Sequence, residues 1–236
     1  AMVIESLMNM TNLGSLRFAF PHQLYMSYDN KTFVDREVNL LREQGVLRTL
    51  NCSAGTVLMK TQDYIDDIDK YVSISTNSNS NSTAVTVRCI NAFKYWGTNC
   101  HQTSVVQQRF LDGTVKSSSD IDKHEDYALT NEDIDALVKA GFLLHRRDTN
   151  VKALWFHHPR LGITSGNVLS MRKQILSAVK KNRFDEMSDK QIAKLKLRQT
   201  GSFVQFGLDF FLADLCGIGS LRLFRAANGT RVYRLT

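Results

Sequence analysis

The chain has few cysteines, and they are scattered. Only Cys52, Cys89, Cys100 and Cys216 occur in 236 residues, and they form no Cys-x-x-Cys pair and have no histidine at zinc-ligand spacing. This pattern excludes a cysteine-based zinc module and a dense disulfide framework. We expect four reduced, mostly buried thiols in an intracellular, soluble protein.

Long apolar runs and a secretory leader are also missing from the sequence. No apolar stretch approaches the length of a transmembrane helix, and no basic segment followed by an apolar core precedes the first predicted element. We therefore expect no membrane partner. Hydrophobic residues make up 43% of the chain, which is enough to bury a substantial core in one large domain or several small ones.

Acidic residues are scarce in the C-terminal part of the chain. Residues 139–236 contain 18 Lys and Arg against 6 Asp and Glu, a net charge of +12, whereas the first 138 residues have a net charge of −5. Together these give the overall charge of +7. Such a division places an anionic partner on the C-terminal part.

The sequence motifs of nucleotide-dependent enzymes are absent. There is no phosphate-binding loop of the GxxxxGK[ST] type, and Gly217-Ile218-Gly219 lacks the third glycine of a dinucleotide site. His145-Arg146-Arg147-Asp148 superficially resembles a kinase catalytic loop, but no asparagine follows at the required offset and no DFG or glycine-rich loop exists. We predict no catalytic residue, no cofactor and no enzymatic activity.

A metal site is not predicted either. His157 and His158 are adjacent on a predicted strand, and neighbouring strand residues point to opposite faces. The acidic run Asp63–Asp69 lacks the spacing of a calcium loop and indicates a solvated helix face.

One pattern of a helix, a glycine and two strands occurs three times. Its marks are Leu41-x-x-x-Gly45, Leu137-x-x-x-Gly141 and a more degenerate Leu215-x-x-x-Gly219, each followed by two predicted strands. In the last copy Asn228-Gly229 lies between the strands, which is a strong hairpin signal. We predict an α+β fold, mainly α, built from three tandem winged-helix domains.

The predicted domain boundaries follow from a polar tract. Ser73–Thr83 consists almost entirely of Ser, Thr and Asn and cannot bury apolar surface, so it is expected to be a linker. This gives winged helices at 1–72, 84–160 and 161–236, with the linker at 73–83. The second domain should open with helices around Val85–Trp96 and Thr103–Phe110.

Basic residues collect on two predicted helices of the third domain. In the first helix Val168, Met171, Ile175 and Val179 form an apolar stripe, Lys173 and Lys180 share another side, and Lys181 and Arg183 follow at the C-terminal end. Arg172 falls near the stripe and would have to reach outward along its own stem. A second helix begins at Ser188, where a capping box with Gln191 is expected, and carries Lys190, Lys194 and Arg198. These helices are either a phosphate-binding surface or ordinary solvated faces.

A winged helix usually meets nucleic acid through its third helix, which is the helix before the glycine in each copy of the pattern. In the three predicted modules this helix is poor in base-reading residues. Asp35 and Glu37 occupy the first and Glu132, Asp133 and Asp135 the second, so both would repel phosphate. Contact with nucleic acid should therefore come from the basic helices of the last module, with Arg160 as a neighbour, and should favour phosphates over bases. Arginines on the last hairpin either contribute to this surface, with Arg231 on its wet face, or only solubilise the strands.

Ordered segments across nearly the whole chain resemble the serine/threonine-protein kinase 19 family. They are Gln23–Tyr25, Val34–Arg36, Leu41–Gly45, Leu137–Gly141, Leu176–Lys181, Gly207-Leu208 and Asp214–Gly217. The resemblance implies three winged helices that bind DNA and, despite the family name, no kinase chemistry. It also implies a nuclear role in transcription-coupled nucleotide excision repair. The family's basic residues match Arg172, Lys180, Lys181, Arg183 and Arg198.

The distribution of charge and the family resemblance together predict a DNA-binding surface of eight residues: Arg160, Arg172, Lys173, Lys180, Lys181, Arg183, Lys194 and Arg198. The expected ligand is double-stranded DNA, with RNA left open. The acidic N-terminal modules are expected to dock transcription and repair proteins such as stalled RNA polymerase II complexes. Whether the chain also forms a homodimer is left open by the sequence. The alternatives are a pure protein scaffold without DNA contact and an atypical serine/threonine kinase.

Overall fold

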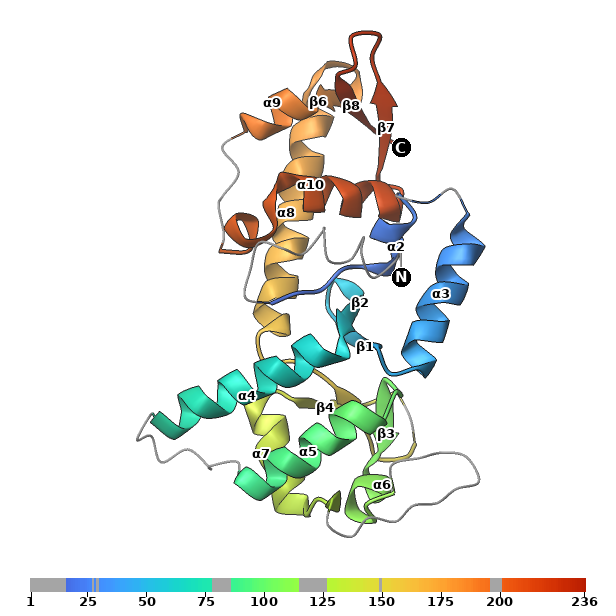
Figure 1. Ribbon diagram of the computed structural model, residues 1–236. Helices are drawn as coiled ribbons and strands as arrows, with labels where there is room; N and C mark the ends of the chain where they lie inside the picture. Colours follow the sequence, from blue (N-terminus) through green and yellow to red (C-terminus); the bar gives the residue numbers. More distant parts are fainter. Residues whose placement is uncertain are drawn as a thin grey trace. The chain divides into compact units, whose positions relative to one another are not determined.

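The computed structural model describes residues 16–26, 28, 30–77, 86–114, 127–148, 150–195 and 201–236 (Figure 1). They mix helices and strands, which confirms the α+β class. The chain divides into two compact units. The C-terminal unit contains the described residues of Ala1–Glu37, Cys52–Thr56 and Gly162–Thr236, and the central unit those of Val38–Asn51 and Val57–Leu161.

The C-terminal unit is built around one long helix and a small antiparallel sheet. The helix α8 (Leu161–Lys181) is followed by the 3-10 turn η2 (Arg183–Asp185), then by β6 (Glu186–Ser188), α9 (Asp189–Ala193), α10 (Gly201–Ile218), β7 (Leu221–Arg225) and β8 (Arg231–Leu235). In the sheet β8 lies between β6 and β7, and Tyr233 of β8 pairs with Met187 on one side and Leu223 on the other.

The local signals in this unit are confirmed. Val168, Met171, Ile175 and Val179 are all buried, as their helical spacing predicts. Ser188 caps α9 through the expected capping box with Gln191. The α10 helix loses helical dihedrals at Gly207 (φ 73°), and the helix predicted before Gly219 follows from that point.

The central unit repeats the same order of elements. It contains α5 (Val87–Asn99), β3 (Ser104–Val106), α6 (Gln107–Leu111), α7 (Asn131–Ala140), β4 (Leu143–Arg146) and β5 (Ala153–Phe156). The last strand again lies in the middle, because β5 pairs with both β3 and β4. The α7 helix begins at a Thr130 capping box and ends at Gly141 (φ 83°), the glycine that the repeated pattern places after this helix.

One predicted helix in the central unit is wrong in its first half. Residues 104–106 form the strand β3, and the helix α6 begins only at Gln107. The reason is that Val105 and Val106 are β-branched and find strand partners in Leu154 and Ala153.

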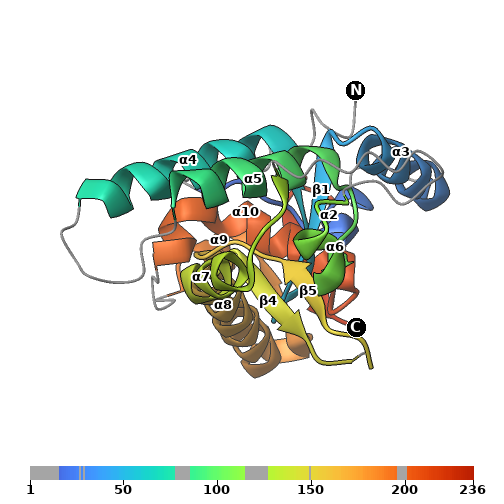
Figure 2. The same ribbon diagram turned by 90° about the horizontal axis from the view of Figure 1, so that it is seen from below.

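The remaining elements come from the N-terminal part of the chain. They are α2 (Pro21–Leu24), α3 (Lys31–Glu43), β1 (Leu47–Cys52), β2 (Gly55–Lys60) and α4 (Thr61–Asn77). The helix, glycine and hairpin predicted here are present, and Gly45 ends the helical segment with φ 71°. The α4 helix extends into the tract predicted as a linker, and residues 78–85 lie outside the described part of the chain. In the central unit α4 and α5 lie side by side (Figures 1 and 2), joined by an ion pair of 2.7 Å between Lys94 and Asp69.

Elements of the first predicted module are divided between the two units. The α3 helix contributes residues up to Glu37 to the C-terminal unit, and so does the hairpin tip Cys52–Thr56. The count of three winged helices and their boundaries stay predictions.

Replacing Gly217 with alanine is expected to lower the free energy of unfolding by about 1–3 kcal/mol. A Cβ at this position of α10 would lie 2.3 Å from the carbonyl oxygen of His22 and 2.7 Å from its carbon, both backbone atoms of α2 that cannot rotate away. Urea unfolding followed by circular dichroism measures the loss. Gly166→Ala on α8 is the control, because an added Cβ there meets nothing within 4 Å and alanine favours the helix, so that variant should be more stable by about 0.5–1 kcal/mol. Equal stabilities of Gly217→Ala and the parent chain would contradict this close approach.

Candidate nucleic-acid interface

Four exposed cations lie along α8 and just beyond its C-terminal end. They are Lys173, Lys180, Lys181 and Arg183, here called the basic cluster. Lys173 and Lys180 are two helical turns apart on the outer side, and the apolar stripe occupies the inner side. Lys180 and Lys181 stand in the last turn, where the helix dipole favours positive charge.

None of these four cations forms an ion pair with another residue that the structure describes. Lys190 on the short helix α9 and Lys194 at its C-cap are also exposed, so positive charge continues past the sheet strand β6. Such charges are available to an external anion without the loss of an internal partner.

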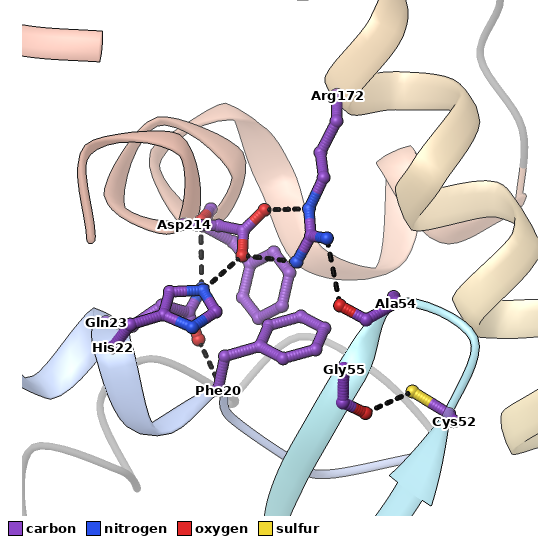
Figure 3. Close-up of polar contacts among 9 residues, drawn as sticks. Phe20, His22, Gln23, Cys52, Ala54, Gly55, Arg172 and Asp214 are labelled. Atoms are coloured by element: carbon purple, nitrogen blue, oxygen red, sulfur yellow. Dashed lines mark hydrogen bonds and ion pairs between the residues drawn. The ribbon is translucent and has the colours of Figure 1, made fainter. Parts of the chain in front are cut away.

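Arg172 does not reach outward as expected. Its side chain is only 13% exposed and turns inward to Asp214 on α10, with 2.7 Å from Nε to Oδ2 and 2.8 Å from Nη2 to Oδ1 (Figure 3). Its Nη1 donates to the carbonyl oxygen of Ala54 at 2.9 Å, and the guanidinium carbon lies 4.9 Å from the centre of the Phe20 ring. The geometry satisfies this cation internally.

Asp214 is the centre of a buried polar network. Its side chain is fully buried and accepts a further hydrogen bond of 2.7 Å from His22 Nε2 on α2 (Figure 3). Beside it, Gln23 donates to the carbonyl oxygen of Phe210 at 3.0 Å and accepts from the amide of Phe20 at 2.8 Å. The network holds the N-terminal segment and the hairpin tip against α8 and α10, which makes it a structural site.

The other predicted residues are in different situations. Lys194 is exposed at the C-cap of α9. Arg160 belongs to the central unit, and its Nη2 lies 3.8 Å from Asp67 Oδ2. Arg198 lies outside the described residues.

Two of the four arginines of the β7–β8 hairpin are used within the unit, whereas Arg222 and Arg225 are exposed. Arg231 bridges Asp189 and Asp209, both at 3.1 Å, and this hydrogen-bonded guanidinium holds the pKa of Asp189 below its ordinary value. Arg234 contacts Glu186 at 2.6 Å. Arg231 is therefore half-buried between α9 and α10 and is not the wet-face cation that strand alternation suggested.

Two features of this unit escaped the sequence reasoning. Asp214 is a carboxylate in an otherwise apolar helical segment, and that contrast could have marked it as buried and paired. Phe184 directly follows the basic end of α8 and is 69% exposed. A lone aromatic after a run of cations was the only signal for it.

Comparison with known proteins decides the family. The model of a family described as inactive serine-threonine protein kinase 19 matches residues 3–235. The chain belongs to this family. A relative from Xenopus laevis, named winged helix repair factor 1, is 23% identical over 217 residues, which cover 88% of this chain and 71% of the relative.

Membership agrees with the absence of kinase motifs from the sequence, since the family's own description calls the kinase inactive. Within the described ranges, His, Cys, Asp and Glu side chains do not gather in threes as a metal site would require. The helices that the structure describes are all too short or too polar to cross a membrane.

Proposed function

We propose that the C-terminal unit binds double-stranded DNA through its phosphates and that the basic cluster makes the main contacts. The observation that carries this proposal is the contrast between two sets of cations. Arg172, Arg231 and Arg234 are satisfied by carboxylates of their own unit, whereas the basic cluster is exposed without such partners among the described residues. Phosphate oxygens would supply those partners.

Binding of this kind should depend little on base sequence. The cations lie on the first helix of the module and in the turn after it, and lysine contacts phosphate as a point charge without reading base edges. The helices α7 and α10, which precede the hairpins, carry Glu132, Asp135 and Asp209 on their exposed sides and would repel the DNA backbone.

The fold that we propose for this function is three tandem winged helices. The order helix, strand, two helices and two strands, with the last strand in the middle of the sheet, occurs in both units and supports two of them. The α3 helix and the β1–β2 hairpin would belong to the first. A helix–hairpin module of this type is a relative of the helix-turn-helix DNA-binding domains.

We further propose that the protein acts without catalysis in the nucleus, as a scaffold in transcription-coupled nucleotide excision repair. The name of the Xenopus relative supports a repair role. The net charge of −5 in the first 138 residues supports docking of proteins, such as those of a stalled RNA polymerase II complex, on that part of the chain.

Charge reversal in the basic cluster tests DNA binding. The variant Lys180→Glu/Lys181→Glu should weaken binding to a labelled random duplex and reduce the slope of log affinity against log salt by about two, because roughly two phosphate contacts are lost. Fluorescence anisotropy at several salt concentrations measures both quantities.

A matched variant separates local contact from net charge. Lys139 and Lys152 are exposed lysines of the central unit, and Lys139→Glu/Lys152→Glu changes the total charge by the same amount. This control should bind nearly as the parent chain does. If both double variants weaken binding equally, no local surface exists, and if neither does, an acidic protein becomes the better candidate partner for the cluster.

A further inference from the structure

The turn between α8 and β6 has an unusual backbone. Phe184 has φ 66° and ψ 16°, and Asp185 follows with φ 52°. They are two successive non-glycine residues in the left-handed region, which L-residues avoid because the Cβ crowds the following carbonyl. Backbone strain of this kind persists only where the surrounding structure holds it in place.

The surrounding contacts show how the turn is held. Asn182 donates from Nδ2 to the carbonyl oxygen of Glu186 at 2.6 Å, and its own carbonyl oxygen accepts from the amide of Asp185 at 3.2 Å. Glu186 is fixed in turn, because it begins β6 and its carboxylate contacts Arg234 of β8 at 2.6 Å. The turn is closed across its base, and Phe184 stands at its tip.

This arrangement exposes a large apolar ring. Phe184 is 69% exposed, although exposing an aromatic ring of this size is unfavourable. Its only cation–ring contact among the described residues is Arg183, whose guanidinium carbon lies 4.8 Å from the ring centre. Neither the strain nor the exposure contributes to folding, so both indicate a binding role.

The charges around Phe184 identify the ligand chemistry. Lys180, Lys181 and Arg183 come immediately before it, and Asp185 is the one opposing charge between residues 180 and 185. An aromatic face among cations is the combination that holds single-stranded nucleic acid, in which the cations follow the phosphates and a base stacks on the ring. In a fully paired duplex the base faces are already stacked and cannot reach such a ring.

We propose that Phe184 stacks against an unpaired base, so that the C-terminal unit binds DNA containing an unpaired segment more tightly than fully paired DNA. This inference rests on the proposed DNA binding and specifies the form of DNA that the same surface selects. The basic cluster holds the phosphates of either form, and Phe184 supplies the preference.

The test compares three labelled probes by fluorescence anisotropy: a random duplex, the same duplex with a central bubble of mismatched bases, and one of its single strands. Phe184→Ala should bind the bubble and the single strand about 5- to 150-fold more weakly, which corresponds to the stacking of one base. Its affinity for the duplex and the salt slope should not change. Phe184→Trp should retain the preference, and its added tryptophan fluorescence should be quenched by the bubble.

The matched control is Phe33→Ala. Phe33 is another phenylalanine exposed on a helix of the same unit, at 43%, and lies outside the basic cluster. It should leave all three affinities unchanged. Bubble binding by Phe184→Ala equal to that of the parent chain would overturn this inference while duplex binding stands. A parent chain that binds none of the probes at low salt would overturn both proposals, and a loss of bubble binding that Phe184→Trp fails to restore would contradict stacking.

Discussion

Replacing Asp214 with alanine is expected to lower the free energy of unfolding by about 3–5 kcal/mol. The carboxylate is fully buried and accepts hydrogen bonds from Arg172 and His22, so its removal leaves a guanidinium that is 13% exposed without its anion. A buried charge that loses its partner retains the cost of desolvation without the compensating attraction. Urea unfolding followed by circular dichroism measures the effect.

Asp209 provides the control for this variant on the same helix. Its side chain is 79% exposed and contacts Arg231 at 3.1 Å, so Asp209→Ala should cost only about 0–1 kcal/mol. The double variant Arg172→Met/Asp214→Leu should recover much of the loss, because it removes both charges and fills the space with apolar groups. Similar losses for Asp209→Ala and Asp214→Ala would show that burial does not govern these pairs.

This network also changes what a mutation of Arg172 means. Because the side chain is committed to Asp214 and Ala54, a loss of DNA affinity in Arg172→Ala would follow from damage to the fold. The basic cluster can be tested without that complication, since its side chains are exposed.

Stability should fall as the pH is lowered from about 6.5 to about 4, and His158 should account for about 3 kcal/mol of the fall. Burial lowers the pKa of His158 from 6.5 to about 4, and the opposing attraction of Asp67 is weaker. Between these pH values the unfolded chain takes up a proton that the folded chain does not, so acid favours unfolding. Above pH 6.5 the His158 ring is neutral in both the folded and the unfolded chain, so its contribution to the free energy of unfolding is fully present.

The hydrogen bonds around His158 support a neutral ring. Its Nδ1 accepts from the backbone amide of Arg160 at 3.3 Å, which requires an unprotonated nitrogen. The 3.6 Å contact of Nε2 with Asp67 is compatible with a neutral N–H donor, and Asp67 is already compensated by Lys70 at 3.0 Å. The geometry and the direction of the pKa shift agree.

The variant His158→Gln isolates this contribution. Unfolding free energies measured in urea between pH 4 and pH 7 should fall less steeply for the variant than for the parent chain, by about 3 kcal/mol over the interval. Other buried groups, including His157, whose pKa burial also lowers, act on both chains alike. Parallel pH profiles would contradict the neutral buried state.

Much of the local structure could be predicted from the sequence because its causes are local. The stripe of Val168, Met171, Ile175 and Val179 sets the buried side of α8 by helical periodicity alone. Thr130 and Ser188 cap helices through residues three positions away, and Gly141 ends one because it tolerates a left-handed conformation. Exposure of Lys173, Lys180 and Lys181 follows from the same periodicity.

What the sequence left undetermined depends on partners far along the chain. The short strands β3 and β6 exist because β5 and β8 return to pair with them, and three residues carry too little periodicity to reveal that. Arg172 turns inward because Asp214, 42 residues away, is buried beside it. Phe184 faces outward because the strand after it fixes the turn. Residue types and spacing therefore determined which helices form and which faces carry charge. Tertiary contacts decided which of those charges are already neutralised within the fold, because packing, and not the neighbours in sequence, sets the partner of a side chain.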